Sequence, residues 1–289
     1  MPAGGRPTVR SRRLGAALRR YREAAKLDQQ HAADHIASSK AKISRVEAGQ
    51  VSARPGDVRL MLELYGVEDR GVYTHLEQLA RDSNKRGWWL DYAVPDGLGD
   101  YIALETDATY IRTWQPLLIP GLLQTEGYTR SLLEGNAANS DPAFAEQVVN
   151  IRQERRKKAE TSGARFAAVV GESTITSALP SRAAHRAQLA DLIESSERAN
   201  VTLQVLPGSE WAATRCSPGF VMLSFDGEWS PTAIGQDTHS SIFVAEDPEE
   251  IAAYAHSFEL LRSTALNPAE SKAFIRQAMN DLPEESTEQ

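Results

Sequence analysis

The residues best suited to chemistry form a short basic cluster near the N-terminus of this 289-residue chain. It contains Lys40, Lys42 and Arg45 together with the small side chain of Ala41. Lysine and arginine donate hydrogen bonds to the O6 and N7 atoms of guanine, and an alanine methyl can touch the methyl of thymine. Residues of these types, carried on one helix, would suit the reading of base edges in the major groove of DNA.

Hydrophobic spacing predicts the helices that would position this cluster. Apolar residues in steps of four, three and four, from Leu14 to Ala25, predict a helix that begins at Ser11. Asp28 is well placed to cap a second, short helix that begins at Gln29. The first two helices would therefore leave only a short connection between them.

Two further helices follow in the sequence. Ser39 can cap a third helix, which contains the basic cluster and stops at Gly49. A fourth helix is predicted from about Asp57 to Gly66. Two short helices with a tight turn and a small residue, Ala33, at their crossing are typical of a helix-turn-helix.

Over about residues 11–66 the chain resembles the XRE-type, phage-repressor-like DNA-binding domain. The likeness rests on Lys26-Leu27-Asp28-Gln29, on Ala33 and on the run Ile43–Gly49. It departs at Ala37, where the family often has glycine, and alanine reaches the left-handed region only at a cost. The resemblance also implies a structural ion pair between two residues of this head, Arg22 and Glu47.

The resemblance implies that the third helix enters the major groove and that the start of the second helix holds phosphate through Gln29 and backbone N–H groups. Arginines near the N-terminus would add a flexible basic arm on the DNA backbone or in the minor groove. These arginines are Arg6, Arg10, Arg12 and Arg13. The expected DNA-binding residues are Gln29, Ser39, Lys40, Ala41, Lys42, Ser44 and Arg45.

Some of these residue types also have ordinary structural interpretations. Arg45 could be a structural surface residue instead of a base contact. His31 and His35 lie four residues apart, a spacing compatible with zinc, but no cysteine or third ligand is close in the sequence. Two surface histidines are therefore the favoured interpretation, and no metal site is expected.

Charge divides the chain into two parts of opposite character. Residues 1–66 hold 13 Lys/Arg against 6 Asp/Glu, whereas residues 67–289 hold 19 against 33. A basic head on an acidic body suggests a polyanion-binding segment joined to a part with another task. No apolar run approaches the roughly 18 residues of a membrane helix, and a single cysteine fits a reducing compartment. A soluble, cytoplasmic protein is expected.

The remainder predicts a mixed body. Without clean βαβ spacing, the pattern favours an all-α helix-turn-helix N-terminal domain followed by a larger α+β domain. Helices are expected at about 100–112, 124–134, 142–161, 184–199, 249–264 and 268–279, and strands at 165–171, 201–206, 220–225 and 242–244. The predicted segments are an arm at 1–10, the head at 11–66, a helical connector at 67–99, the body at 100–282 and an acidic tail at 283–289.

The body offers little for catalysis. It contains no glycine-rich phosphate loop, no HExxH and no GxSxG. Arg215 could lower the pKa of the neighbouring Cys216 thiol, although a structural thiol is the favoured interpretation. Glu172 follows a predicted strand, but a lone acid is weak support for catalysis. We therefore expect neither an enzyme nor a cofactor.

Over roughly residues 100–280, the body resembles the effector domain of unknown function that follows XRE-type domains in actinobacterial regulators, including WhiJ-like and antitoxin-like members. The likeness departs at Arg156, where the family usually has glutamine. It rests on Pro120–Thr125, Tyr128, Arg152, Arg155, Arg156, Glu172, Gln188, Leu189, Val201–Pro207, Gly219 and Phe220. The candidate residues for a partner or ligand are Gln124, Thr125, Tyr128, Arg152, Arg155 and Glu172.

Two functions follow from these resemblances. The first is a sequence-specific, double-stranded-DNA-binding transcriptional regulator, a homodimer on a near-palindromic operator. A small protein encoded nearby, or a small molecule, would modulate it through the body. The second is an antitoxin-like protein or sensor whose main task is to bind a partner, with DNA binding secondary.

Overall fold

The chain divides into two compact units, one over Met1–Leu90 and one that begins at Asp91. Arg6 of the expected arm, Cys216 and the tail 283–289 lie outside the described residues. The computed structural model describes residues 8–83, 87–92, 96–134, 142–177, 181–214, 217–225, 232–237, 242–245 and 247–282.

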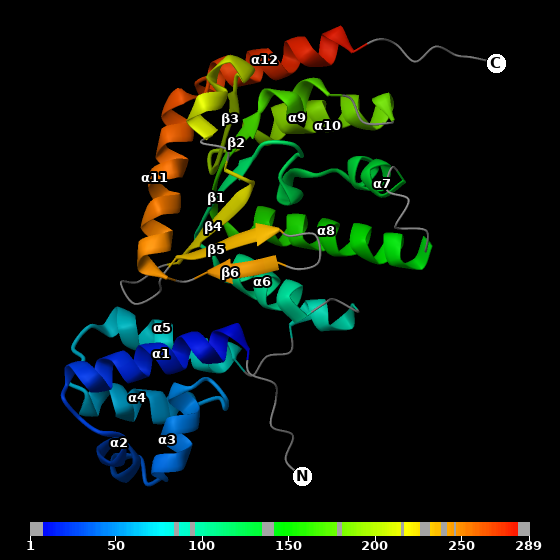
Figure 1. Cartoon of the computed structure of the whole chain (residues 1–289). Helices are drawn as coiled ribbons and strands as arrows, with labels where there is room; N and C mark the ends of the chain where they lie inside the picture. The colour runs from blue at the N-terminus through cyan, green and yellow to red at the C-terminus, as the bar shows by residue number, and fades with distance from the viewer. Residues whose placement is uncertain are drawn as a thin grey trace. The chain divides into compact units, whose positions relative to one another are not determined.

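The first unit is helical, as the sequence predicts, and its helices are shown in Figure 1. Asp28 and Ser39 cap the second and third helices, and both caps are confirmed. The first helix begins at Val9, two residues before the predicted start, because Thr8 and Ser11 form a capping box there. The helices are α1 (Val9–Ala24), α2 (Gln29–His35), α3 (Lys40–Glu47), α4 (Pro55–Leu64) and α5 (Arg70–Asp82), followed by the 3-10 helix η1 (Trp88–Asp91).

Helix α1 and the end of α3 approach one another at backbone distance. A side chain on Gly15 of α1 would place its Cβ 2.3 Å from the carbonyl oxygen of Val46, so only glycine fits there. Gly49, just after α3, has a φ of 67°, and a Cβ there would lie 2.5 Å from Cα of Arg12. The hydroxyl of Ser11 donates to the carbonyl of Gly49 at 2.8 Å. These contacts fix the end of α3 against α1.

The turn between α2 and α3 forms the C-terminal cap of α2. Ala37 has a φ of 49°, the left-handed conformation in which its Cβ is unfavourable. The N–H of Ser38 donates to the carbonyl of Ala33, and that of Ala37 to the carbonyl of Asp34. This pair of hydrogen bonds is the Schellman arrangement, which usually has glycine at the residue that Ala37 occupies.

The second unit confirms the α+β class and is built on a six-stranded sheet of order β3-β2-β1-β4-β5-β6. Strand β1 pairs in parallel with β2, and β2 with β3, whereas β4, β5 and β6 are antiparallel to their neighbours. The strands are β1 (Tyr110–Gln115), β2 (Arg165–Gly171), β3 (Val201–Leu206), β4 (Phe220–Ser224), β5 (Ala233–Asp237) and β6 (Ile242–Ala245). Two helical crossovers therefore join parallel strands, which the sequence analysis did not predict.

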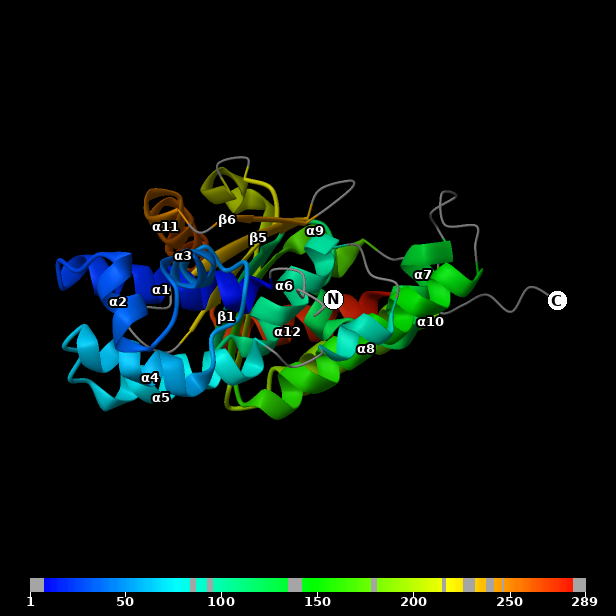
Figure 2. The same ribbon diagram turned by 90° about the horizontal axis from the view of Figure 1, so that it is seen from below.

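Helices cover both faces of this sheet. Figures 1 and 2 show α11 on one face and α6 and α8 on the other. The core beneath α11 includes Trp114, Phe220 and Phe258, each at most 1% exposed. The helices are α6 (Asp96–Asp107), η2 (Gly121–Leu123), α7 (Glu126–Glu134), α8 (Pro142–Ser162), α9 (Glu172–Thr176), α10 (Arg182–Ser195), η3 (Gly208–Thr214), α11 (Pro248–Thr264) and α12 (Pro268–Asp281).

One predicted helix of this unit is confirmed as α6, but its predicted C-terminal end is wrong. The helix expected at about 100–112 ends at Asp107, and β1 begins at Tyr110. Strand β1 packs on both faces, where Ile111 and Trp114 are buried. No described helix is both long enough and apolar enough to cross a membrane.

The strained turn leads to a stability prediction. Ala37→Gly should stabilise the first unit by about 1 kcal/mol, because glycine adopts the left-handed conformation without the Cβ clash. Ala16→Gly, at an exposed site inside α1, is the matched control and should destabilise it by roughly 1 kcal/mol. Hydrogen exchange of α1–α4 amides in the full chain measures both changes. Destabilisation by Ala37→Gly would contradict the strain argument.

Candidate nucleic-acid interface

Helix α3 presents one exposed face and buries the other. Its buried residues are Ile43, Val46 and Glu47, which attach the helix to the rest of the unit. The exposed residues at and after its start are Ser39, Lys40, Ala41, Ser44, Arg45 and Ala48. Small side chains therefore alternate with cations, which lets the helix approach a polyanion closely while charges reach outward.

A buried ion pair holds α3 to α1, as the resemblance implied. Arg22 donates to Glu47 from Nε at 2.6 Å and from Nη2 at 2.9 Å, and the two side chains are only 9% and 4% exposed. A third N–H of Arg22 reaches the carbonyl of Leu27 at 2.7 Å. The hydrogen bond to Glu47 raises the pKa of Arg22. The charge-assisted pair thus ties α1, the following loop and α3 together.

The start of α2 is occupied by protein groups. The side-chain amide of Gln29 donates to Glu47 at 2.9 Å, so it takes part in the buried ion pair. The carboxylate of Asp28 accepts from the N–H groups of Gln30 and His31 at 2.8 and 3.0 Å. These hydrogen bonds from His31 lower the pKa of Asp28. A phosphate at this end of α2 would have to compete with Asp28 for these N–H groups.

The three cations of α3 differ in their surroundings. Lys40 and Arg45 are exposed, and Arg45 Nε lies 3.4 Å from the carbonyl of Ala41. Lys42 is different, because its ammonium donates to the carboxylate of Asp57 at 2.9 Å. Asp57 lies in the first turn of α4 and was not among the predicted site residues. The sequence carried no signal for this pair, since the two residues are 15 positions apart.

Other basic residues of the first unit lie on α1. Arg10, Arg12 and Arg13 were expected in a flexible arm, but α1 begins at Val9 and includes all three. The Arg10 guanidinium lies 5.9 Å from the ring centre of Trp89 and 3.5 Å from the carbonyl of Asp82. Val9 and Arg10, the last two residues of the expected arm, therefore belong to α1.

The two histidines of α2 do not meet a third ligand among the described residues. His31 Nδ1 lies 2.7 Å from the carboxylate of Asp28. Within the described ranges, no group of three or more His, Cys, Asp or Glu side chains is arranged to hold a metal ion.

In the second unit, four candidate partner residues meet in one buried network. Gln124 is 3% exposed, donates to the carbonyl of Ile119 at 2.7 Å, and accepts from Arg152 and from Thr129. The Tyr128 hydroxyl accepts from the N–H of Ile119 at 3.3 Å, and burial raises the pKa of Tyr128. Thr125 caps α7 by accepting from the N–H of Tyr128.

Gln188 of α10 completes this network. It donates to the carbonyl of Leu123 at 2.8 Å and accepts from the N–H of Thr125 at 2.7 Å. The loop of residues 119–125 therefore exchanges hydrogen bonds with side chains from α7, α8 and α10. This arrangement accounts for the spacing of these residues in the sequence without a ligand.

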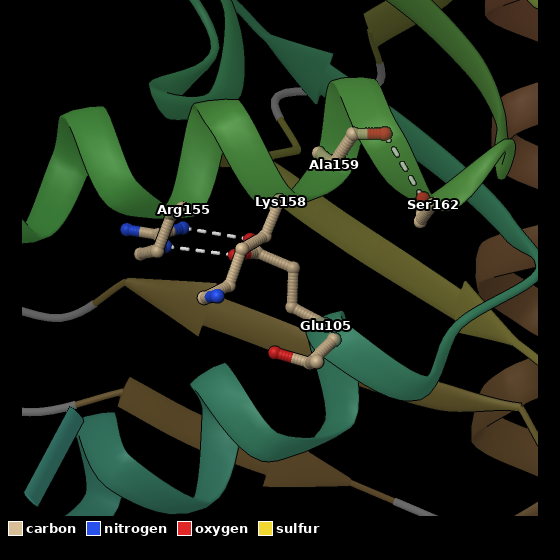
Figure 3. Close-up of a pocket in the computed structure, with 6 residues that line it drawn as sticks. Glu105, Arg155, Lys158, Ala159 and Ser162 are labelled. Carbon is tan, nitrogen blue, oxygen red and sulfur yellow. Dashed lines mark hydrogen bonds and ion pairs between the residues drawn. The ribbon is translucent and has the colours of Figure 1, made fainter. Parts of the chain in front are cut away.

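Arg155 pairs with Glu105 instead of joining the network. Its guanidinium donates to both carboxylate oxygens at 2.8 and 2.7 Å and stacks on Tyr101. Figure 3 shows this pair with Lys158 beside it, at a hollow of about 10 Å³. A second hollow of about 20 Å³ is lined by Arg155, by Gly121 and by strand residues such as Ile111. Each has room for about one water molecule.

The remaining residues that carry the likeness join separate elements. Glu172, at the end of β2, accepts from the N–H of Gly208 after β3 at 2.6 Å. Arg156 donates to Asp191 of α10 at 2.6 Å and to Glu160 at 3.0 Å. Glu172 and Arg156 therefore connect neighbouring elements of the second unit.

The buried ion pair of the first unit leads to a pH prediction. Tyr65 lies close to it, is 7% exposed, and has a hydroxyl with no hydrogen-bond partner among the described residues. Burial, reinforced by the Glu47 carboxylate, raises the pKa of Tyr65 to about 12. Below pH 10 the phenol is protonated in both states. Between pH 10 and 12 only the unfolded chain ionises, so stability is lost as pH rises.

Tyr65→Phe should remove this part of the alkaline loss. Between pH 8 and pH 11, the free energy of unfolding of the first unit should fall by about 1 kcal/mol more in the unmodified chain than in the variant. An NMR titration of ring-labelled tyrosine, assigned with the variant, measures the ionisation directly. A Tyr65 that titrates near pH 10 would contradict the burial argument.

The network in the second unit gives another stability prediction. Gln188→Met should destabilise this unit by about 2–4 kcal/mol, because it leaves the Leu123 carbonyl and the Thr125 N–H buried and unpaired. The matched control, Gln277→Met, changes an exposed glutamine on α12 and should cost less than about 0.5 kcal/mol. Hydrogen exchange of the 119–125 segment measures both. Equal effects of the two variants would show that the network contributes nothing.

Two comparisons with protein families agree with the division of the chain into two units. Residues 13–72 match the family model described as "Helix-turn-helix domain", and residues 98–277 match that described as "Domain of unknown function (DUF5753)". Comparison with curated proteins and with solved structures gives no significant match. The helix-turn-helix match indicates a DNA-binding regulator, and the second match is to a domain whose function is not known.

Proposed function

Because the chain belongs to the DUF5753 family and carries a helix-turn-helix domain at its N-terminus, we propose that it is a sequence-specific DNA-binding transcriptional regulator. The observation that carries this proposal is the exposed face of α3. It offers Lys40 and Arg45 with the small residues Ala41 and Ser44 between them. A helix with such a face can lie in the major groove, where its first residues reach base edges.

The fixed attachment of α3 favours sequence-specific contacts with bases over non-specific electrostatic binding. A side chain discriminates between bases only if its helix keeps a fixed orientation in the groove. The Ser39 cap fixes the start of α3, and the Arg22–Glu47 pair fixes its end. Arg45 would donate to guanine, and Lys40 to guanine or a phosphate.

We further propose that the regulator acts as a homodimer. One head reads a single half-site, so two heads about 34 Å apart would read a near-palindromic operator. The second unit would supply dimerisation and would receive a signal from a small protein or a small molecule. Candidate contact residues are Gln124, Thr125, Tyr128, Arg152, Arg155 and Glu172, of which the buried ones would act through the shape of the 119–125 loop.

A second candidate is an antitoxin-like or sensor protein whose main task is partner binding. The acidic surplus of residues 67–289, with 33 Asp/Glu against 19 Lys/Arg, favours a basic partner for that unit. Copurification of a small basic protein, or its release of the chain from DNA, would support this candidate.

The DNA proposal is tested by fluorescence anisotropy with the full chain. The chain first selects its preferred duplex from random sequences, and Kd is then measured on selected and scrambled DNA at two salt concentrations. A preference of at least about a thousandfold that persists at the higher salt is expected. Equal, salt-erased binding to both duplexes would overturn the proposal.

Substitution of Arg45 sharpens the test. Arg45→Ala should reduce the preference by about 1–3 kcal/mol if this side chain reads a base. Arg81→Ala is the matched control, since Arg81 lies on α5 and pairs with Glu77, and it should leave the preference unchanged. Equal weakening on both duplexes, with a shallower salt dependence, would assign Arg45 to the phosphates.

A further inference from the structure

One carboxylate pairs with a cation of the candidate DNA-binding helix. Asp57 Oδ2 lies 2.9 Å from the ammonium of Lys42, and the two side chains are 22% and 36% exposed. Asp57 comes from the first turn of α4, which begins at Pro55. A residue from a neighbouring helix thus sets the position of a charge on α3.

This pair changes what Lys42 can offer to DNA. Non-specific affinity comes mainly from cations that neutralise phosphates and release counterions. A lysine already neutralised by a carboxylate contributes little to that term, and the carboxylate itself repels phosphates. An ammonium has three N–H donors, so two remain after the hydrogen bond to Asp57 and can reach an acceptor on a base.

We propose that Asp57 is a specificity-determining residue, an inference that rests on the proposed DNA-binding function. Asp57 lowers the affinity for arbitrary DNA by neutralising Lys42. On the correct sequence it holds the ammonium in place to donate to guanine O6 or N7. Asp57 therefore increases the difference in affinity between selected and scrambled DNA. A repulsive contribution that weakens binding to the wrong partner increases specificity in this way.

A purely structural role makes a different prediction. Asp57 sits near the N-terminus of α4, where a negative charge stabilises the helix. If that were its whole role, replacing it would weaken α4 and reduce binding to every DNA in proportion. The experiment must therefore compare two duplexes and not one.

The test measures Kd of the full chain with Asp57→Asn on selected and on scrambled DNA over a range of salt. The variant should bind scrambled DNA roughly 5- to 10-fold more tightly, with a salt slope steeper by about one phosphate contact. Affinity for the selected DNA should rise less, so the ratio between the duplexes falls. Hydrogen exchange of α4 reports whether the helix is intact.

Two companion variants complete the design. Asp34→Asn removes one exposed carboxylate of α2, which accepts from Gln30, and is the matched charge control. It should change both Kd values by the same factor and leave their ratio unchanged. In a Lys42→Met background, Asp57→Asn should no longer lower the ratio, because the cation that it releases is absent.

The outcomes separate the two proposals. If the unmodified chain prefers no DNA sequence, the proposed function fails, and the role of Asp57 fails with it. If the chain discriminates normally but Asp57→Asn keeps the ratio, only the role of Asp57 is overturned. The same holds if Asp34→Asn lowers the ratio equally, since bulk charge would then explain the effect.

Discussion

The buried pair between Arg22 and Glu47 is the interaction on which the first unit depends. It joins α1 to α3, and through further hydrogen bonds it includes the Leu27 carbonyl and the Gln29 amide. Two charges removed from water are compensated only when each finds several partners, and loss of one partner leaves the other uncompensated. The pair therefore favours the arrangement of α1 and α3 in which both charges keep their partners.

Close glycine contacts and a helix cap also fix the position of α3. Gly15 and Gly49 let α1 touch the end of α3 at backbone distance, so α3 cannot slide along α1 without a clash. At the other end, Ser39 caps α3 and Asp57 holds Lys42. Helix α3 is thus held along its buried side, while the opposite side stays exposed. Such an arrangement suits a surface that must keep its shape when it meets a rigid duplex.

Local features of the sequence were enough to predict most elements. The caps at Asp28 and Ser39 placed α2 and α3, and the apolar runs of β2 and β3 gave their bounds. The helix predicted at 100–112 extends three residues into strand β1, which contains the polar residues Arg112 and Thr113. In the structure, Thr113 is buried and its hydroxyl donates to the carbonyl of Phe220 on β4. Because these two residues are 107 positions apart, the residues near Thr113 in the sequence do not predict this hydrogen bond.

The same limit explains why side-chain roles were harder to predict than helices. The partner of Lys42 comes from another helix, and Gln188, which accepts from the N–H of Thr125, lies 63 positions from it in the sequence. In the second unit, the residues that carry the family likeness mostly satisfy buried polar groups or join neighbouring elements. Their contacts give these residues a role in holding the fold of this unit together. They do not by themselves identify a ligand, so the case for function rests on the exposed face of α3, where Lys40 and Arg45 are exposed to solvent.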